Sequence, residues 1–151
     1  MPRTLYVDAD ACPVKDEALK VAERYGVPIV LVANTGLRPS RDPLVRYVMV
    51  AKGADAADDW IVEHLAAGDV VVTADIPLAA RALAAGAQAL GPTGKLFTDD
   101  SIGISLALRD LNRHLRETGE SRGLNPEFGP RDRSRFLSAL DAALRRPAAA
   151  V

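Results

Sequence analysis

Two carboxylates, Asp8 and Asp10, follow an apolar run near the start of the chain and are separated by one residue. Side chains alternate along an extended chain, so both acids can point the same way where a strand ends. Two acids this close repel each other unless a cation or a shared proton relieves the repulsion. Mg²⁺ and Mn²⁺ prefer oxygen ligands and are the usual relief. The pair therefore predicts a metal site at the carboxyl end of a strand, which is where open α/β sheets bind ligands.

Further acids also follow apolar segments. Asp55 and Asp58 begin a segment with helical spacing, and Asp75 comes shortly after the apolar run 70–73. If this run forms a strand beside the strand expected at 4–8, these acids share one rim of the sheet. Ions held there would activate water for attack on phosphorus. The predicted ligands of one or two Mg²⁺ or Mn²⁺ ions are Asp8, Asp10, Asp55, Asp58 and Asp75.

Each acid also has a purely structural interpretation. Asp75 and Asp55 stand where helix N-caps are expected, and Asp10 can cap the helix expected to begin near Pro13. Asp8 is harder to explain in this way, because an acid that directly follows a buried apolar run needs a partner. The metal site thus depends on several acids meeting at one rim and not on any single residue.

The elements that must position these acids alternate between strands and helices, which predicts a parallel sheet covered on both faces. We therefore expect a three-layer α/β/α fold with a mainly parallel central sheet of four to five strands. Residues 1–118 would form this α/β domain, and residues 119–151 a linker and a last helix that packs on the same domain. Strands are expected at 4–8, 27–33, 45–50, 70–73 and 87–90, helices at 14–25, 55–67, 76–85, 100–117 and 131–146, and a loop at 91–98.

The composition is that of an ordinary globular protein, with 151 residues, 48% hydrophobic and 26% charged. The net charge of -1 does not indicate a nucleic-acid-binding protein, so such a role requires a local basic patch. A single cysteine excludes an internal disulfide and fits a reducing cytoplasm. The N-terminus lacks a signal-peptide pattern, and no apolar run is long enough to span a membrane. We therefore expect a cytoplasmic protein with no membrane partner.

Basic residues near the expected rim are candidate phosphate contacts. Lys15 follows the first strand, and Arg131 and Arg133 begin the last helix, so they can form basic lips beside an acidic pocket. The alternative is that Lys15 is simply solvated and that Arg131-Asp132-Arg133 forms surface salt bridges. Cys12 lies just before a helix N-terminus, which favours a thiolate, although a buried apolar cysteine is the commoner case.

Four segments carry a resemblance to a known family: Val7-Asp8-Ala9-Asp10-Ala11-Cys12-Pro13, Ala57-Asp58-Asp59-Trp60-Ile61, Thr73-Ala74-Asp75-Ile76-Pro77-Leu78-Ala79, and Arg131-Asp132-Arg133 with Phe136. Through them nearly the whole chain resembles the YaiI/YqxD family, a small bacterial group with PIN-like nuclease domains. The resemblance implies that Asp8, Asp58 and Asp75 correspond to acids of PIN nucleases. The remaining PIN acid, usually a Glu on an earlier helix, has no clear match, and Asp10 or Asp55 can substitute for it.

Three functions remain open from the sequence. The leading expectation is a divalent-metal-dependent nuclease that hydrolyses phosphodiesters, with RNA favoured over DNA and Asp8, Asp10, Asp58 and Asp75 as its catalytic acids. The first alternative is a phosphatase of the haloacid dehalogenase type, in which Asp8 attacks phosphorus, Asp10 transfers a proton and Asp99-Asp100 hold Mg²⁺. The second is a PIN-like protein that binds nucleic acid without cleaving it. A homodimer is an open alternative to a monomer.

Overall fold

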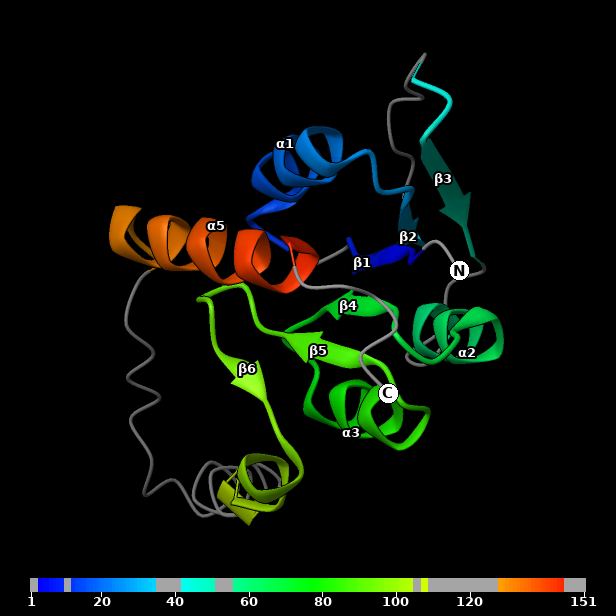
Figure 1. Ribbon diagram of the computed structural model, residues 1–151. Helices are drawn as coiled ribbons and strands as arrows, with labels where there is room; N and C mark the ends of the chain where they lie inside the picture. Colours follow the sequence, from blue (N-terminus) through cyan, green and yellow to red (C-terminus); the bar gives the residue numbers. More distant parts are fainter. Residues whose placement is uncertain are drawn as a thin grey trace.

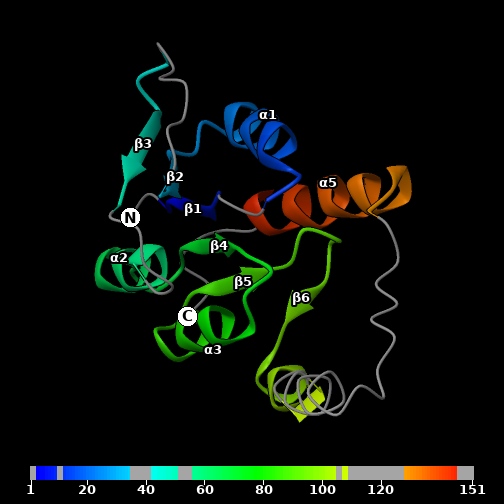
Figure 2. The ribbon, with the colours of Figure 1, turned by 180° about the vertical axis from the view of Figure 1, so that it is seen from behind.

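The computed structural model describes residues 3–9, 12–34, 42–50, 56–104, 107–108 and 128–145. In this part of the chain, one sheet of six strands lies between two layers of helices (Figures 1 and 2). Residues 99–104 and 107–108 are also helical. The strands are β1 (Leu5–Asp8), β2 (Ile29–Ala33), β3 (Val45–Met49), β4 (Val70–Val72), β5 (Gln88–Leu90) and β6 (Leu96–Phe97), and the helices are α1 (Lys15–Tyr25), α2 (Ala56–His64), α3 (Ile76–Ala84) and α5 (Pro130–Arg145).

The strand order across the sheet is β3-β2-β1-β4-β5-β6. The first five strands are parallel, and β6 runs antiparallel to β5. The predicted three-layer fold with a mainly parallel sheet is therefore confirmed. The sheet has one strand more than the expected four to five, because β6 forms within 91–98, where we predicted a loop. A strand of two residues is too short to produce an alternating pattern.

Two hydrophobic cores cover the two faces of the sheet, and successive residues of each strand contribute to opposite cores. Helices α1 and α5 lie over one face, and α2 and α3 lie over the other (Figure 1). We call these sides the α1/α5 face and the α2/α3 face. The strands contribute Leu5, Val7, Ile29, Leu31, Val70 and Val72 to the α1/α5 face, and Tyr6, Val30, Val32, Val71 and Ala89 to the α2/α3 face.

Backbone requirements fix two of the turns. Helix α1 ends as predicted at Gly26, which adopts a left-handed conformation with φ 62° and donates its N–H to carbonyls of the last turn. Gly94, with φ 89°, lies against α5 so closely that a Cβ there would come within 2.7 Å of the backbone carbonyl of Arg135. The turn between β5 and β6 therefore packs directly against the last helix.

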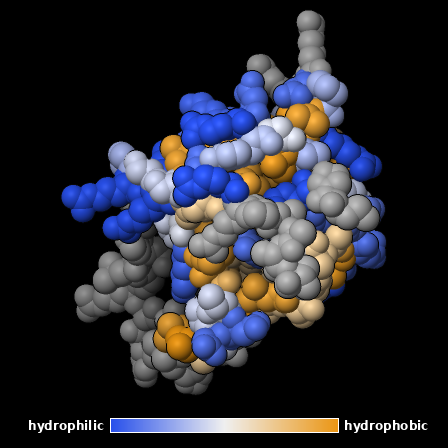
Figure 3. Space-filling model, in the orientation of Figure 1, coloured by the Kyte–Doolittle hydropathy of each residue, from blue (hydrophilic) through white to orange (hydrophobic). Residues whose placement is uncertain are grey.

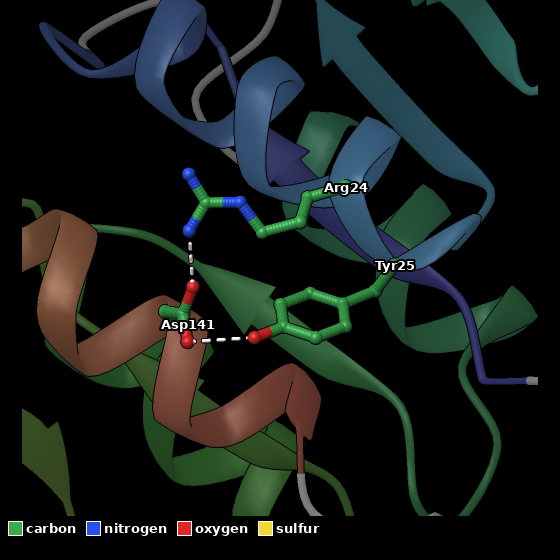
Figure 4. A network of polar contacts seen from close by, with 3 residues as sticks. All are labelled: Arg24, Tyr25 and Asp141. Carbon is green, nitrogen blue, oxygen red and sulfur yellow. Dashed lines mark hydrogen bonds and ion pairs between the residues drawn. The ribbon is translucent and has the colours of Figure 1, made fainter.

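Helix α5 belongs to the same core as α1. Its residues Phe136 and Leu140 are fully buried in the α1/α5 face. A polar network also joins the two helices at their surface (Figure 4). The Arg24 guanidinium donates to Asp141 Oδ2 at 2.6 Å, and the Tyr25 hydroxyl donates to Asp141 Oδ1 at 2.7 Å. The last helix therefore packs on the α/β unit and contributes to its hydrophobic interior.

None of the helices in the described ranges has the length and apolar character needed to cross a membrane.

Candidate active site

The strand order reverses between β1 and β4, which are neighbours in the sheet. In open parallel sheets, ligands bind at the carboxyl ends of the strands at such a reversal. Asp8 is the last residue of β1, and Thr73 directly follows β4. The predicted neighbourhood of these two strands is confirmed by their parallel register, in which Val7 lies beside Val72.

Hydrogen bonds link the chain after β4 to the end of β1. The Thr73 hydroxyl donates to Asp8 Oδ2 at 3.0 Å, and the backbone N–H of Asp75 donates to the same hydroxyl oxygen at 3.0 Å. Thr73 is only 1% exposed, so this hydroxyl is held in a fixed position. The structure thus places Asp8 and Asp75 at the same edge of the sheet, on either side of a buried threonine.

Strand alternation places these groups on one side of the sheet. Tyr6 and Val71 face α2 and α3, so Asp8 and Thr73, two residues further along their strands, have the same orientation. Asp75 immediately precedes α3 on this side. The carboxyl rim of the α2/α3 face is therefore where the acids gather.

Asp58 lies in the first turn of α2 and is buried, with 7% of its surface exposed. The last residue of this helix, His64, accepts a hydrogen bond through its carbonyl from Tyr6, which lies two residues before Asp8 on β1. The helix therefore runs from the carboxyl rim toward the amino edge of the sheet, and Asp58 belongs to the rim end. Burial of a carboxylate is costly unless other groups compensate for the lost hydration.

Asp75 also serves as a helix cap. Its Oδ1 accepts a hydrogen bond from the backbone N–H of Leu78 at 2.9 Å, which confirms the structural interpretation for this residue. Capping occupies one oxygen of the carboxylate, and the two roles are compatible because a carboxylate carries two acceptor oxygens.

The described residues include only part of the predicted set of metal ligands. Asp10 and Asp55 lie outside them, and their assignment as ligands stays a prediction. In the parts of the chain that the structure describes, no three His, Cys, Asp or Glu side chains come together as a metal-binding group. Of the predicted set, Asp8 and Asp75 lie at the rim and Asp58 lies in the first turn of α2, without forming a three-ligand group. Carboxylate oxygens are the donors that Mg²⁺ and Mn²⁺ prefer.

The basic residues predicted to contact phosphate belong to the α1/α5 side. Lys15 is the first residue of α1 and is half-buried, and Arg131 is exposed near the start of α5. Arg133 donates to the carbonyl of Pro13 at 2.7 Å and to Glu17 Oε1 at 3.0 Å. Figure 3 shows hydrophilic side chains gathered over α1 and the adjoining end of α5. Arg133 thus forms a surface salt bridge, as the alternative interpretation expected, and its partner lies on another helix.

Cys12 behaves as the buried cysteine of the commoner interpretation. It packs in the core of the α1/α5 face. Burial raises the pKa of its thiol, and the negative charges of Asp8 and Glu17 act in the same direction, against a lowering by a backbone hydrogen bond. A raised pKa disfavours the thiolate, which is the nucleophilic form of a cysteine.

The acids required by the phosphatase alternative are far from Asp8. Because β6 is antiparallel, the chain leaves it toward the amino edge of the parallel strands, and Asp99 and Asp100 follow at that edge. Asp8 ends β1 at the carboxyl edge, and two strands, β4 and β5, lie between β1 and β6. This arrangement does not bring the Asp99-Asp100 pair to Asp8.

Two features escaped the sequence analysis. Thr73 was expected as the last residue of the strand at 70–73, but not as the hydroxyl that joins Asp8 to Asp75. Its position directly after an apolar strand is the signal that points to it. The stacking of Trp60 on His64 was also missed, although their spacing of four residues on a helix places two rings on the same side.

Nearly the full length of the chain matches known proteins. The family model described as "Uncharacterized BCR, YaiI/YqxD family" matches residues 6–146. The chain belongs to the YaiI/YqxD family. It is similar to UPF0178 proteins of Mesorhizobium japonicum, with 68% identity over 95% of this chain and 92% of that protein, and of Rhizobium etli, with 62% identity over 94% and 92%. A UPF0178 protein of Agrobacterium fabrum is 61% identical over 94% of this chain and 93% of its own length. No solved structure matches the chain.

Proposed function

We propose that this member of the YaiI/YqxD family is a divalent-metal-dependent nuclease that hydrolyses phosphodiester bonds, with RNA favoured over DNA. The observation that carries the proposal is the hydrogen-bonded connection of Asp8, Thr73 and Asp75 at the reversal of the strand order. This position is the general ligand site of open parallel sheets. Bound Mg²⁺ or Mn²⁺ would supply a water of lowered pKa and stabilise negative charge on the phosphate.

The residues of the chain have separate tasks in this proposal. Asp8, Asp58 and Asp75 would hold the cation from three different elements, together with Asp10 or Asp55. The hydroxyl of Thr73 donates to Asp8 and so fixes the orientation of that carboxylate, as partners behind a metal ligand commonly do. Lys15 at the rim end of α1, with Arg131 as an exposed outer contact, would attract the phosphate backbone.

The proposal is tested by cleavage of single-stranded RNA, single-stranded DNA and a generic phosphatase substrate with Mg²⁺, Mn²⁺ or EDTA. We expect metal-dependent cleavage of RNA that Asp8→Asn lowers by about 100-fold or more. Asp59→Asn is the matched control, because Asp59 adjoins Asp58 but is exposed and paired with Arg81 at 2.9 Å. Turnover of the phosphatase substrate alone would contradict the proposal in favour of an aspartyl-phosphate mechanism. Binding of RNA without metal-dependent cleavage would contradict it in favour of a binding protein.

A further inference from the structure

A stacked pair of rings lies on the α2/α3 face, below the carboxyl rim. The Trp60 indole and the His64 imidazole are nearly parallel, with centroids 3.8 Å apart and an interplanar angle of 15°. Trp60 is half-buried and packs against the core of this face, with Tyr6 at 6.3 Å. His64 is exposed. One face of the imidazole is thus covered by the indole, while the His64 residue as a whole stays exposed.

The imidazole is oriented by its own helix, and the end of this helix is held by the sheet. His64 Nδ1 lies 2.7 Å from the carbonyl of Trp60, to which it can only donate. The Tyr6 hydroxyl donates to the carbonyl of His64 at 3.1 Å, which attaches the end of α2 to β1. The exposed imidazole face is therefore a pre-oriented surface, and ordering it on binding would cost little conformational entropy.

A cation accompanies the rings. The Arg46 guanidinium lies 5.8 Å from the centroid of the Trp60 ring. Arg46 is exposed on β3, and its register through Val30 to Tyr6 places it on the same face as the acids. Aromatic rings with an adjacent arginine are the recurring means by which proteins bind single-stranded nucleic acid, because every base offers a ring face for stacking.

The rings also lie at a useful distance from the rim. Trp60 is two residues after Asp58 on α2, which is roughly 3 Å along the helix axis, and His64 is roughly 9 Å from it. The outer side of α2 carries Asp59 and Glu63, and Asp59 is neutralised by Arg81. The outer side of α2 therefore offers no attraction for phosphates, and any affinity at this place has to come from stacking and from Arg46.

We infer that the exposed face of His64, supported by Trp60 and flanked by Arg46, is a stacking platform for an unpaired nucleobase of single-stranded nucleic acid. This inference rests on the proposed function for the choice of ligand. A strand whose base stacks on His64 passes its backbone toward Arg46 and along α2 to the acids at the rim. Duplexes are excluded from this contact, because their bases are already stacked on one another.

The test uses Trp60 as its own reporter, since it is the only tryptophan of the chain. Its emission is followed while a short oligouridylate or oligoadenylate is added in EDTA, which separates binding from metal-dependent cleavage. We expect quenching by both oligonucleotides, and weaker quenching by an abasic sugar-phosphate oligomer of equal length and by a duplex. His64→Ala should weaken binding about 5- to 100-fold, and His64→Phe should restore it. Arg46→Gln should weaken binding less and reduce its dependence on salt.

Lys20→Gln is the matched control, because Lys20 is an exposed cation of α1 on the opposite face of the sheet. Equal affinity of His64→Ala and the unmodified chain would overturn the platform, even if RNA is cleaved in the presence of metal. Quenching that depends on His64 would support the platform even if Asp8→Asn has no effect on RNA, in which case only the proposed nuclease activity fails. Equal quenching by the abasic oligomer would also overturn it, because charge and not stacking would then hold the ligand.

Discussion

At the scale of single residues, Thr73 is the side chain that explains most about the rim. Its hydroxyl is buried and is used twice, as a donor to Asp8 and as an acceptor from the N–H of Asp75. A side chain of the same shape without the hydroxyl would leave a carboxylate oxygen and a backbone N–H in need of new partners. The orientation of Asp8 therefore depends on a residue that is not itself charged.

We expect Thr73→Val to lower the free energy of unfolding by about 1–3 kcal/mol, because it removes both hydrogen bonds while conserving shape. Chemical denaturation measures this loss. Thr73→Ser keeps the hydroxyl and removes only a methyl group, so its cost should be near 1 kcal/mol or less. An equal loss for both variants would show that packing of the methyl group, and not the hydroxyl, stabilises this position.

At the scale of elements, the contact between α1 and α5 is held by side-chain hydrogen bonds as well as by the hydrophobic core. Asp141 of α5 accepts hydrogen bonds from Tyr25 and Arg24 of α1 (Figure 4). The Tyr25 hydroxyl, and after it Arg24, hold the pKa of the Asp141 carboxyl below its usual range. The same hydrogen bond to Asp141 is the main cause that raises the pKa of Tyr25. Both shifts favour the folded state near neutral pH.

The sign of the pH dependence follows from these directions. The stabilisation by Asp141 is fully present above about pH 4 and is lost as the pH falls through its lowered folded pKa. We therefore expect the stability of the wild-type chain to decrease more steeply below about pH 4 than that of Asp141→Asn. Tyr25→Phe removes the largest cause of the shift and should also flatten this decrease. Denaturant unfolding at several pH values measures both slopes, and parallel slopes for all three chains would refute the assignment.

The elements themselves were largely predictable, because their signals are local. The apolar runs that became β1, β2 and β4, and the Gly26 stop of α1, stand out in the sequence. The strand β6 did not, since two residues carry no periodicity. The salt bridge from Arg133 to Glu17 was also unpredictable, because it depends on how α5 crosses α1 and not on spacing within either helix.

At the scale of the whole molecule, the order of the strands decides which distant residues can act together. The sequence predicted that Asp8 and Asp75 would meet if strands β1 and β4 were neighbours, and the sheet has this order. It also separates Asp8 from Asp99 and Asp100, which the sequence had left as a pair for the phosphatase alternative. The order and direction of the strands therefore bear on the phosphatase alternative in a way that motif spacing alone does not.

The faces of the sheet divide the predicted site in a way that the sequence did not reveal. The acids and the ring pair of Trp60 and His64 belong to the α2/α3 face, whereas Arg133 is engaged on the α1/α5 face. Side-chain alternation in a strand gives relative faces, but only the packing of helices decides what covers each face. A substrate strand would therefore approach the rim along α2, and α1 would lie on the opposite face of the sheet.

The most direct test of the central claim is the calorimetric titration of the metal-free protein with Mn²⁺. We expect saturable binding of one or two ions that Asp8→Asn abolishes or weakens by at least about tenfold while the variant stays folded by circular dichroism. Asp59→Asn should bind Mn²⁺ as the unmodified chain does. Unchanged Mn²⁺ affinity in a folded Asp8→Asn variant would contradict the account, because the acids at the ends of β1 and β4 would then not hold the cation.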